Sequence, residues 1–301
     1  MLASIVFISI KVIDLDVDLS ILTSQKAIIV VSGALLFQLL LMFLAAFIWW
    51  QVLSCFHSEV PPFARTTSIF FKANIGKYLP GNIGHFVGRQ LMGPSLGMTQ
   101  SQLAASSVFE TGLNLISAVL ISLILSGDKL FEVYYSLGYQ HSKLLLVVLV
   151  GAPVILLILL VISRKQRILA EIFAHLREIS FWIRSLVIFI LASIQFLWIG
   201  ALYAFLLQLS IPFSFADAGA VMSASVIAWL IGYIVPGVPG GIGVRESALL
   251  LILLHYPPEI ILSVAVIQRI ITMIVDVFAW IFGLLLGRMT AAKESIPPQP
   301  S

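Results

Sequence analysis

Long apolar runs alternate with short polar connections along this chain. We interpret six stretches as membrane-spanning helices: residues 1–13, 27–53, 103–125, 144–162, 185–209 and 260–287. All but the first reach the roughly 20 residues that cross the hydrocarbon core of a bilayer as a helix. The first is interrupted by Lys11, and we expect it to be a short or truncated span.

Two further stretches, residues 63–97 and 213–254, are apolar at both ends but broken by proline and glycine at the centre. Together with the loop charges, this predicts two re-entrant hairpins that enter the membrane from opposite faces. One alternative stays open, because residues 218–235 carry no charge and are long enough to cross fully. The predicted fold is an all-α polytopic membrane protein with about six full spans, two broken-helix hairpins and an inverted repeat.

The connecting segments predict the orientation. Residues 163–184 hold an excess of arginine and lysine over glutamate, which the positive-inside rule places in the cytoplasm. Apolar residues at helical spacing in the same connection predict an amphipathic helix on the inner leaflet. Both termini are then cytoplasmic, in a multi-pass protein of the cell (inner or plasma) membrane. Residues 1–290 form one transmembrane domain, and residues 291–301 are expected to be a disordered tail.

Composition supports this assignment and excludes other classes. The chain of 301 residues is 60% hydrophobic and 10% charged, whereas about a quarter of the residues in soluble domains are charged. The net charge of +3 comes from loops beside the spans, so nucleic acid is not an expected partner. The single cysteine, Cys55, permits no internal disulfide, and we expect no metal and no cofactor.

The two broken stretches align without a gap over residues 78–89 and 234–245. The matched residues are Pro80 with Pro236, Gly81 with Gly237, Gly84 with Gly240 and Arg89 with Arg245. Pro239 and Gly241 extend the second break. Irregular backbone survives at membrane depth only where protein buries it or where it lines a wet cavity. The matches therefore predict an inverted repeat and a polar cavity, although close helix packing is an alternative role for the glycines.

Ionisable side chains in membrane helices usually face a bundle interior or a wet pathway. The candidate substrate-binding residues are Arg89, Arg245, Glu110, Asn114, Arg269, Asp276, His85 and Glu246. The first two would hold a phosphate, and Glu110 and Asp276 would balance charge. The competing interpretation is a structural charge network, such as Glu110 with Arg89 or Arg245 with Asp276. Whether the two motifs face one cavity or two is left open.

Two segments carry a family resemblance. They are GKYLPGNIGHFVGR, residues 76–89, and PGGIGVRESALLL, residues 239–251. They resemble the membrane region of lysylphosphatidylglycerol synthases, a flippase-like family, and the order of spans agrees over residues 27–287. The resemblance implies lipid translocation. Because the chain ends fourteen residues after Gly287, we expect a stand-alone member without the aminoacyltransferase domain.

The leading hypothesis is a flippase that moves an anionic or zwitterionic phospholipid, or a lipid-linked substrate, between leaflets. A membrane-embedded transferase acting on a polyprenyl-phosphate substrate is an alternative, with Glu110, Asp276 and His85 as candidate bases. A lipid-binding scaffold is another. The sequence contains no nucleotide-binding P-loop and no recognised catalytic motif, which favours a non-enzymatic role. Expected partners are membrane lipids, with a second copy of the chain or a separate lipid-modifying enzyme as candidate protein partners.

Overall fold

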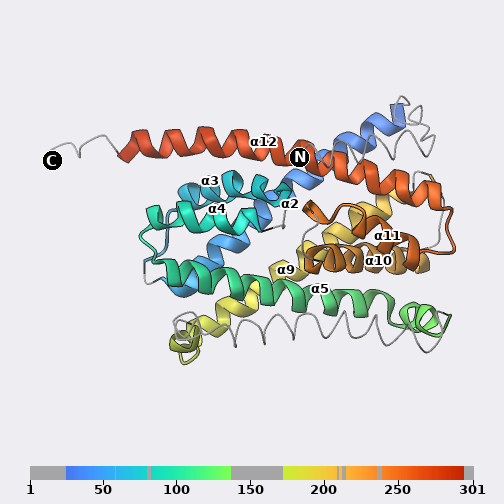
Figure 1. Cartoon of the computed structure of the whole chain (residues 1–301), viewed down its shortest axis with the longest axis horizontal. Helices are drawn as coiled ribbons and strands as arrows, with labels where there is room; N and C mark the ends of the chain where they lie inside the picture. The colour runs from blue at the N-terminus through green and yellow to red at the C-terminus, as the bar shows by residue number, and fades with distance from the viewer. Residues whose placement is uncertain are drawn as a thin grey trace.

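A computed structural model describes most of the chain (Figure 1). It covers residues 25–57, 59–79, 83–136, 172–208, 210–211, 215–235 and 239–294. Within these residues, all regular structure is helical and no strand is present. Five helices are long and apolar enough to cross a membrane: α2 (Gln25–Phe56), α5 (Gln100–Ser136), α9 (Ile179–Gln208), α10 (Phe215–Ile234) and α12 (Pro258–Glu294). The predicted class, an all-α polytopic membrane protein, is confirmed.

Four of the predicted spans correspond to α2, α5, α9 and α12. The predicted spans at residues 1–13 and 144–162 lie outside the described residues. The fifth long helix, α10, covers residues 218–235 almost completely, so this piece of the second broken stretch does have the length to cross. That is the alternative that the sequence left open.

Several helix ends differ from the prediction. Helix α5 continues to Ser136, through the first part of the connection expected after residue 125, and α9 begins at Ile179 rather than at residue 185. Helix α12 runs to Glu294, past the boundary set at residue 290. Hydropathy marks only the part of a helix that lies in hydrocarbon, and charged residues at its ends do not interrupt the backbone hydrogen bonds. Of the predicted amphipathic connection, only residues 172–184 are described.

The first broken stretch folds into α3 (Phe63–Asn74), the 3-10 turn η2 (Ile75–Tyr78), α4 (Gly84–Met92) and the 3-10 turn η3 (Gly93–Leu96). At 12 and 9 residues, α3 and α4 are each too short to cross a bilayer. In the second stretch, α10 is followed by η5 (Pro239–Gly241) and the 9-residue α11 (Val244–Ile252). The predicted helix-break residues Pro80, Gly81, Pro236 and Gly237 lie outside the described residues.

Glycines let the two limbs of each broken stretch approach closely. A Cβ on Gly76 would lie 2.5 Å from the carbonyl carbon of Gly84, and a Cβ on Gly88 would lie 3.0 Å from the Cβ of Ala73. Helices α3 and α4 therefore run antiparallel. In the second stretch, a Cβ on Gly241 would lie 2.9 Å from the carbonyl oxygen of Gly232. Gly241 also has a φ of 71°, which favours glycine. The glycines therefore serve both the break and the packing.

The helix contacts have an internal two-fold pattern. Helix α3 packs against α12 and α4, whereas α10 packs against α5 and α11; α2 packs against α9, and η2 against η5. Exchanging α2, α3, η2, α4 and α5 for α9, α10, η5, α11 and α12 preserves these pairings. In Figure 1, α3 and α4 lie along one half of α12, and α10 and α11 lie along the other half. This arrangement supports the predicted inverted repeat.

Helix α12 carries a second close contact that the sequence did not point to. Gly283 and Gly287 are four residues apart and face α3, where a Cβ on Gly283 would lie 2.9 Å from Cβ of Phe71. Small residues at this spacing let membrane helices pack tightly. The Ser68 hydroxyl uses this closeness to donate a 2.7 Å hydrogen bond to the Gly283 carbonyl.

Candidate functional site

A cavity of about 270 Å³ lies between the two broken stretches, and both contribute to its wall. All eight residues proposed from the sequence line it: Arg89, Arg245, Glu110, Asn114, Arg269, Asp276, His85 and Glu246. The two motifs therefore face one shared cavity. That these residues bind a substrate stays a prediction.

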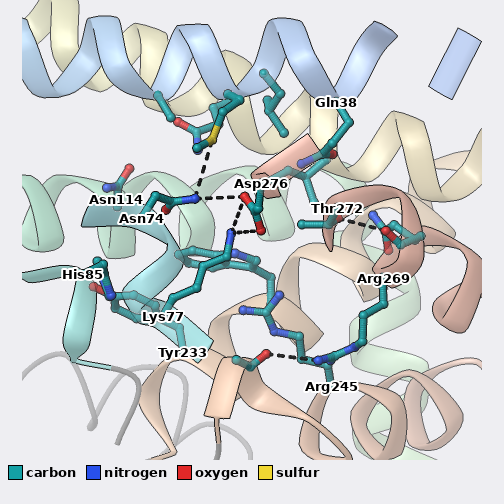
Figure 2. A pocket seen from close by; sticks show the side chains of 18 of the residues that line it. Gln38, Asn74, Lys77, His85, Asn114, Tyr233, Arg245, Arg269, Thr272 and Asp276 are labelled. Carbon is teal, nitrogen blue, oxygen red and sulfur yellow. Dashed lines mark hydrogen bonds and ion pairs between the residues drawn. The ribbon is translucent and has the colours of Figure 1, made fainter. Parts of the chain in front are cut away.

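Asp276, near the middle of α12, attaches the first break to that helix. Its carboxylate accepts hydrogen bonds from the Asn74 amide at 2.9 Å and the Tyr78 hydroxyl at 2.5 Å. Lys77 forms an ion pair with it at 2.7 Å. Figure 2 shows Asn74 and Lys77 directed at Asp276. The suggested pair of Arg245 with Asp276 is therefore wrong, because η2 turns Lys77 toward this carboxylate.

Arg89 of α4 and Glu110 of α5 form the second ion pair. An Nη1 of Arg89 lies 2.7 Å from a carboxylate oxygen of Glu110, and both side chains are buried. The guanidinium also lies over the rings of Phe70 and Trp49, with its carbon 4.4 and 5.0 Å from their centroids. This is the Glu110–Arg89 pair that the network interpretation suggested, and it holds α4 against α5.

Arg269 attaches the second break to α12. Its guanidinium lies 2.8 Å from Glu246, which is buried in the first turn of α11, and donates a 3.5 Å hydrogen bond to the carbonyl of Gly240. Arg269 and Asp276 are two helical turns apart, as their spacing predicts. Through these two residues, α12 holds the second break and the first break side by side (Figure 2).

Arg245 differs from the other cations of the cavity. No hydrogen bond or ion pair reaches its guanidinium from any residue that the structure describes, and its Nε is buried without a partner. The guanidinium carbon lies 5.9 Å from the ring centroid of Trp229, which stacks on Tyr233. Glycine at position 232 leaves room for the stem, because a Cβ there would clash with Cγ of Arg245 and lie 2.8 Å from its Nε. Among the described residues, Arg245 is thus held in place by packing rather than by a polar partner.

Other cavity groups also lack partners. Nδ1 of His85 and Oδ1 of Asn114 are buried, and neither atom takes part in a hydrogen bond within the described part of the chain. Asn74, Lys77, Tyr78, Trp229 and Tyr233 also line the cavity and were not proposed from the sequence as binding residues. Lys77 lies near the first break, where a lysine side chain could also have extended toward headgroups at the membrane surface. Its place three residues before the Pro80 break was the available signal that it faces inward.

The carboxylates of the cavity are engaged by cations rather than grouped as metal ligands. Among the described residues, no three histidine, cysteine, aspartate or glutamate side chains come together in a way that could hold a metal ion.

Comparison with known proteins assigns the family. The model of the lysylphosphatidylglycerol synthase transmembrane region matches residues 2–279 of the chain. No curated protein matches it. The match includes both broken stretches and the whole lining of the cavity, and it agrees with the resemblance carried by residues 76–89 and 239–251. This chain belongs to the family of the lysylphosphatidylglycerol synthase transmembrane region.

Proposed function

We propose that the protein translocates an anionic or zwitterionic phospholipid, or a lipid-linked substrate, between the two leaflets of the membrane. The observation that carries the proposal is Arg245, a cation with no polar partner among the described residues, in a cavity built by both halves of an internal repeat. A buried charge without a partner is costly, and a protein retains one where a ligand supplies the counter-charge.

The position of the breaks supports translocation through the centre of the molecule. The turns η2 and η5 are in contact, and a Cβ added to Gly240 of η5 would lie 3.8 Å from the ring of Tyr78 in η2. Hydrogen bonds hold both residues near the middle of α12. We infer that the two broken stretches enter from opposite faces and meet at this depth. Broken helices that meet at the midplane are how transporters with inverted repeats build a substrate site.

The ion pairs argue against a carboxylate as the general base of the transferase alternative. A general base needs a carboxylate that can accept a proton from the substrate. Glu110 is paired with Arg89, and Asp276 already accepts hydrogen bonds from three side chains. Neither is available without first breaking a buried interaction.

The test is leaflet exchange of acyl-labelled fluorescent phospholipids in vesicles that contain the purified full chain, read by an impermeant quencher. Wild type should expose the inner-leaflet label, and Arg245→Ala should slow exchange by about tenfold or more, since a hydrogen bond to a charged group is lost. Arg288→Ala, at an exposed position of α12, is the matched control and should exchange at the wild-type rate. Absence of exchange by wild type across anionic and zwitterionic lipids would overturn the proposal.

A further inference from the structure

Glu246 differs from the other two carboxylates of the cavity. Its Oε1 lies 2.8 Å from Nη2 of Arg269, but its Oε2 is buried without a hydrogen-bond partner among the described residues. Both oxygens of Asp276 are engaged, and neither oxygen of Glu110 is buried without a partner in the same part of the chain. An unsatisfied carboxylate oxygen is costly to bury while the group is charged, and protonation removes the charge. The second oxygen of Glu246 is therefore a candidate proton-binding atom.

The surroundings of Glu246 explain why this oxygen is unsatisfied. The charged and titratable groups around it are Arg269 of α12, Tyr203 of α9, Tyr78 of η2, Tyr233 of α10 and Arg245 of α11 itself. The hydroxyl of each tyrosine has a partner elsewhere, at Ile261, Asp276 and Thr111 respectively. The start of α11 has no side-chain cap hydrogen bond, and η5 contains no ionisable residue. Within the described residues, direct contact with Arg269 is what neutralises Glu246.

The position of Glu246 next to Arg245 connects the proton to the ligand. The two residues are consecutive in the first turn of α11, and both line the cavity. An anion bound at Arg245 would therefore lie beside the Glu246 carboxylate. Two anions this close repel each other strongly where little water screens them. If Oε2 carries a proton, the repulsion disappears and the O–H group can donate a hydrogen bond to the anion.

We propose that Glu246 takes up one proton from water when a phosphate group binds at Arg245, so that headgroup and proton enter the cavity together. The inference rests on the proposed function, because it assigns a coupling ion to the same cavity. While the cavity is empty, Arg269 and the positive start of α11 favour the ionised carboxylate. The arriving phosphate reverses this preference, and the new O–H bond forms at Oε2.

Proton uptake would also supply a driving force. The positive charge of the proton cancels the negative charge that the phosphate brings, so the occupied cavity has the same net charge as the empty one. A pH difference across the membrane can then drive the headgroup from one leaflet to the other. This agrees with the absence of a nucleotide-binding P-loop from the sequence.

The test is isothermal titration calorimetry of the detergent-solubilised full chain. The probes are short-chain phosphatidylglycerol and phosphatidylcholine, because their phosphodiester stays ionised throughout the pH range used. Titration in two buffers with different heats of ionisation counts the protons taken up. Wild type should approach one proton per bound lipid. Because the bound state holds more protons, affinity should rise as the pH falls from about 8 to about 5.5, by up to about tenfold per pH unit.

Two variants assign the proton to Glu246. Glu246→Gln has the shape and a donor of the protonated carboxyl group but cannot titrate, so it should bind without proton uptake and with a constant affinity across the pH range. Glu246→Asp keeps a titratable carboxyl group and should keep proton uptake. Glu259→Gln, at an exposed position of α12, is the matched control and should behave like wild type. Thermal unfolding checks that each variant folds.

The proton count separates coupling from a purely electrostatic effect. If Glu246→Gln only removes a negative charge near the ligand, affinity rises equally at every pH and proton uptake is unchanged, which overturns the inference. Wild type that binds lipid without proton uptake also overturns it, and leaflet exchange by that protein would leave the proposed translocation standing. Proton-linked binding that needs Glu246, without leaflet exchange, supports the inference and overturns the proposed translocation instead.

Discussion

Arg89 and Arg245 occupy matching places in the two repeats, yet their surroundings give them different roles. Arg89 lies 2.7 Å from Glu110 and against aromatic rings, so it belongs to the buried framework. Arg245 has no polar partner among the described residues and faces the cavity. Residue type and spacing are the same in both cases. The carboxylate on the neighbouring helix distinguishes the structural Arg89 from Arg245, which we propose binds an anion.

This difference predicts opposite effects on stability. Arg89→Gln should lower the free energy of unfolding by about 3 to 5 kcal/mol, because Glu110 is left as an unpaired buried charge. Arg245→Gln should lower the free energy of unfolding far less, since it leaves no carboxylate without its partner. Unfolding in detergent, followed by tryptophan fluorescence, measures both. Replacing Arg89 and Glu110 together by methionine is the control and should recover most of the loss. Similar losses for the two single arginine variants would contradict these roles.

At the scale of elements, the first hairpin depends on a contact between backbones. Gly84→Ala would place a Cβ against the carbonyl of Gly76, where neither atom belongs to a flexible side chain. We expect α4 to be displaced from α3, with a lower melting temperature and a lower yield of folded protein. Gly112→Ala on α5 is the matched control, because nothing lies within 4 Å of the added methyl group and alanine favours the helix. The prediction fails if both variants have the same melting temperature.

The elements also show what the sequence could predict. Proline, glycine and arginine recur in register at an unchanged offset, so the repeat and its two breaks were accessible. The helix starts were not, because Gly84 begins α4 whereas the matching Gly240 has a φ of 60° in η5 and α11 begins only at Val244. The partner of Asp276 was equally inaccessible. It depends on how η2 is rotated against α12, and this rotation is set by packing over the whole chain.

At the scale of the whole molecule, the ends of the helices define two sides. Arg184, near the start of α9, donates a hydrogen bond to the carbonyl of Ser54 near the end of α2, so these helix ends lie together. Rings of Phe63 and Trp50 place the start of α3 at this same end. From the positive-inside rule, we predict that this is the cytoplasmic side.

This orientation predicts the labelling of single cysteines in a Cys55→Ser background. Val60→Cys and Met289→Cys, both at exposed positions, should react with an impermeant thiol reagent only from the cytoplasmic side. Leu254→Cys, exposed after α11, should react only from the opposite side. Labelling of Val60→Cys and Leu254→Cys from one side would contradict the opposite entry of the two broken stretches. The Cys55→Ser protein without an added cysteine, treated with the same reagent, gives the background signal.

The asymmetry between the repeats gives a final prediction for the molecule as a whole. The offset that places Arg89 on Arg245 places Glu110 on Val266, so Val266→Glu would give the second repeat the carboxylate that the first repeat has. Because the repeats share their helix pairing, the added carboxylate should reach Arg245 and neutralise it. Leaflet exchange should then slow about as far as in Arg245→Ala, although the arginine is still present.

Val266→Gln is the matched control, because glutamine has nearly the same shape as glutamate and carries no charge. It should keep the leaflet exchange that Val266→Glu loses, and thermal unfolding of both variants checks that they fold. If the two variants exchange lipid at the same rate, the carboxylate does not reach Arg245, and the internal two-fold does not extend to the side chains of the cavity. If only the charged variant loses exchange, a single position decides which repeat holds the anion. The unequal halves of the cavity then define the ligand site, while the shared helix framework defines its place in the membrane.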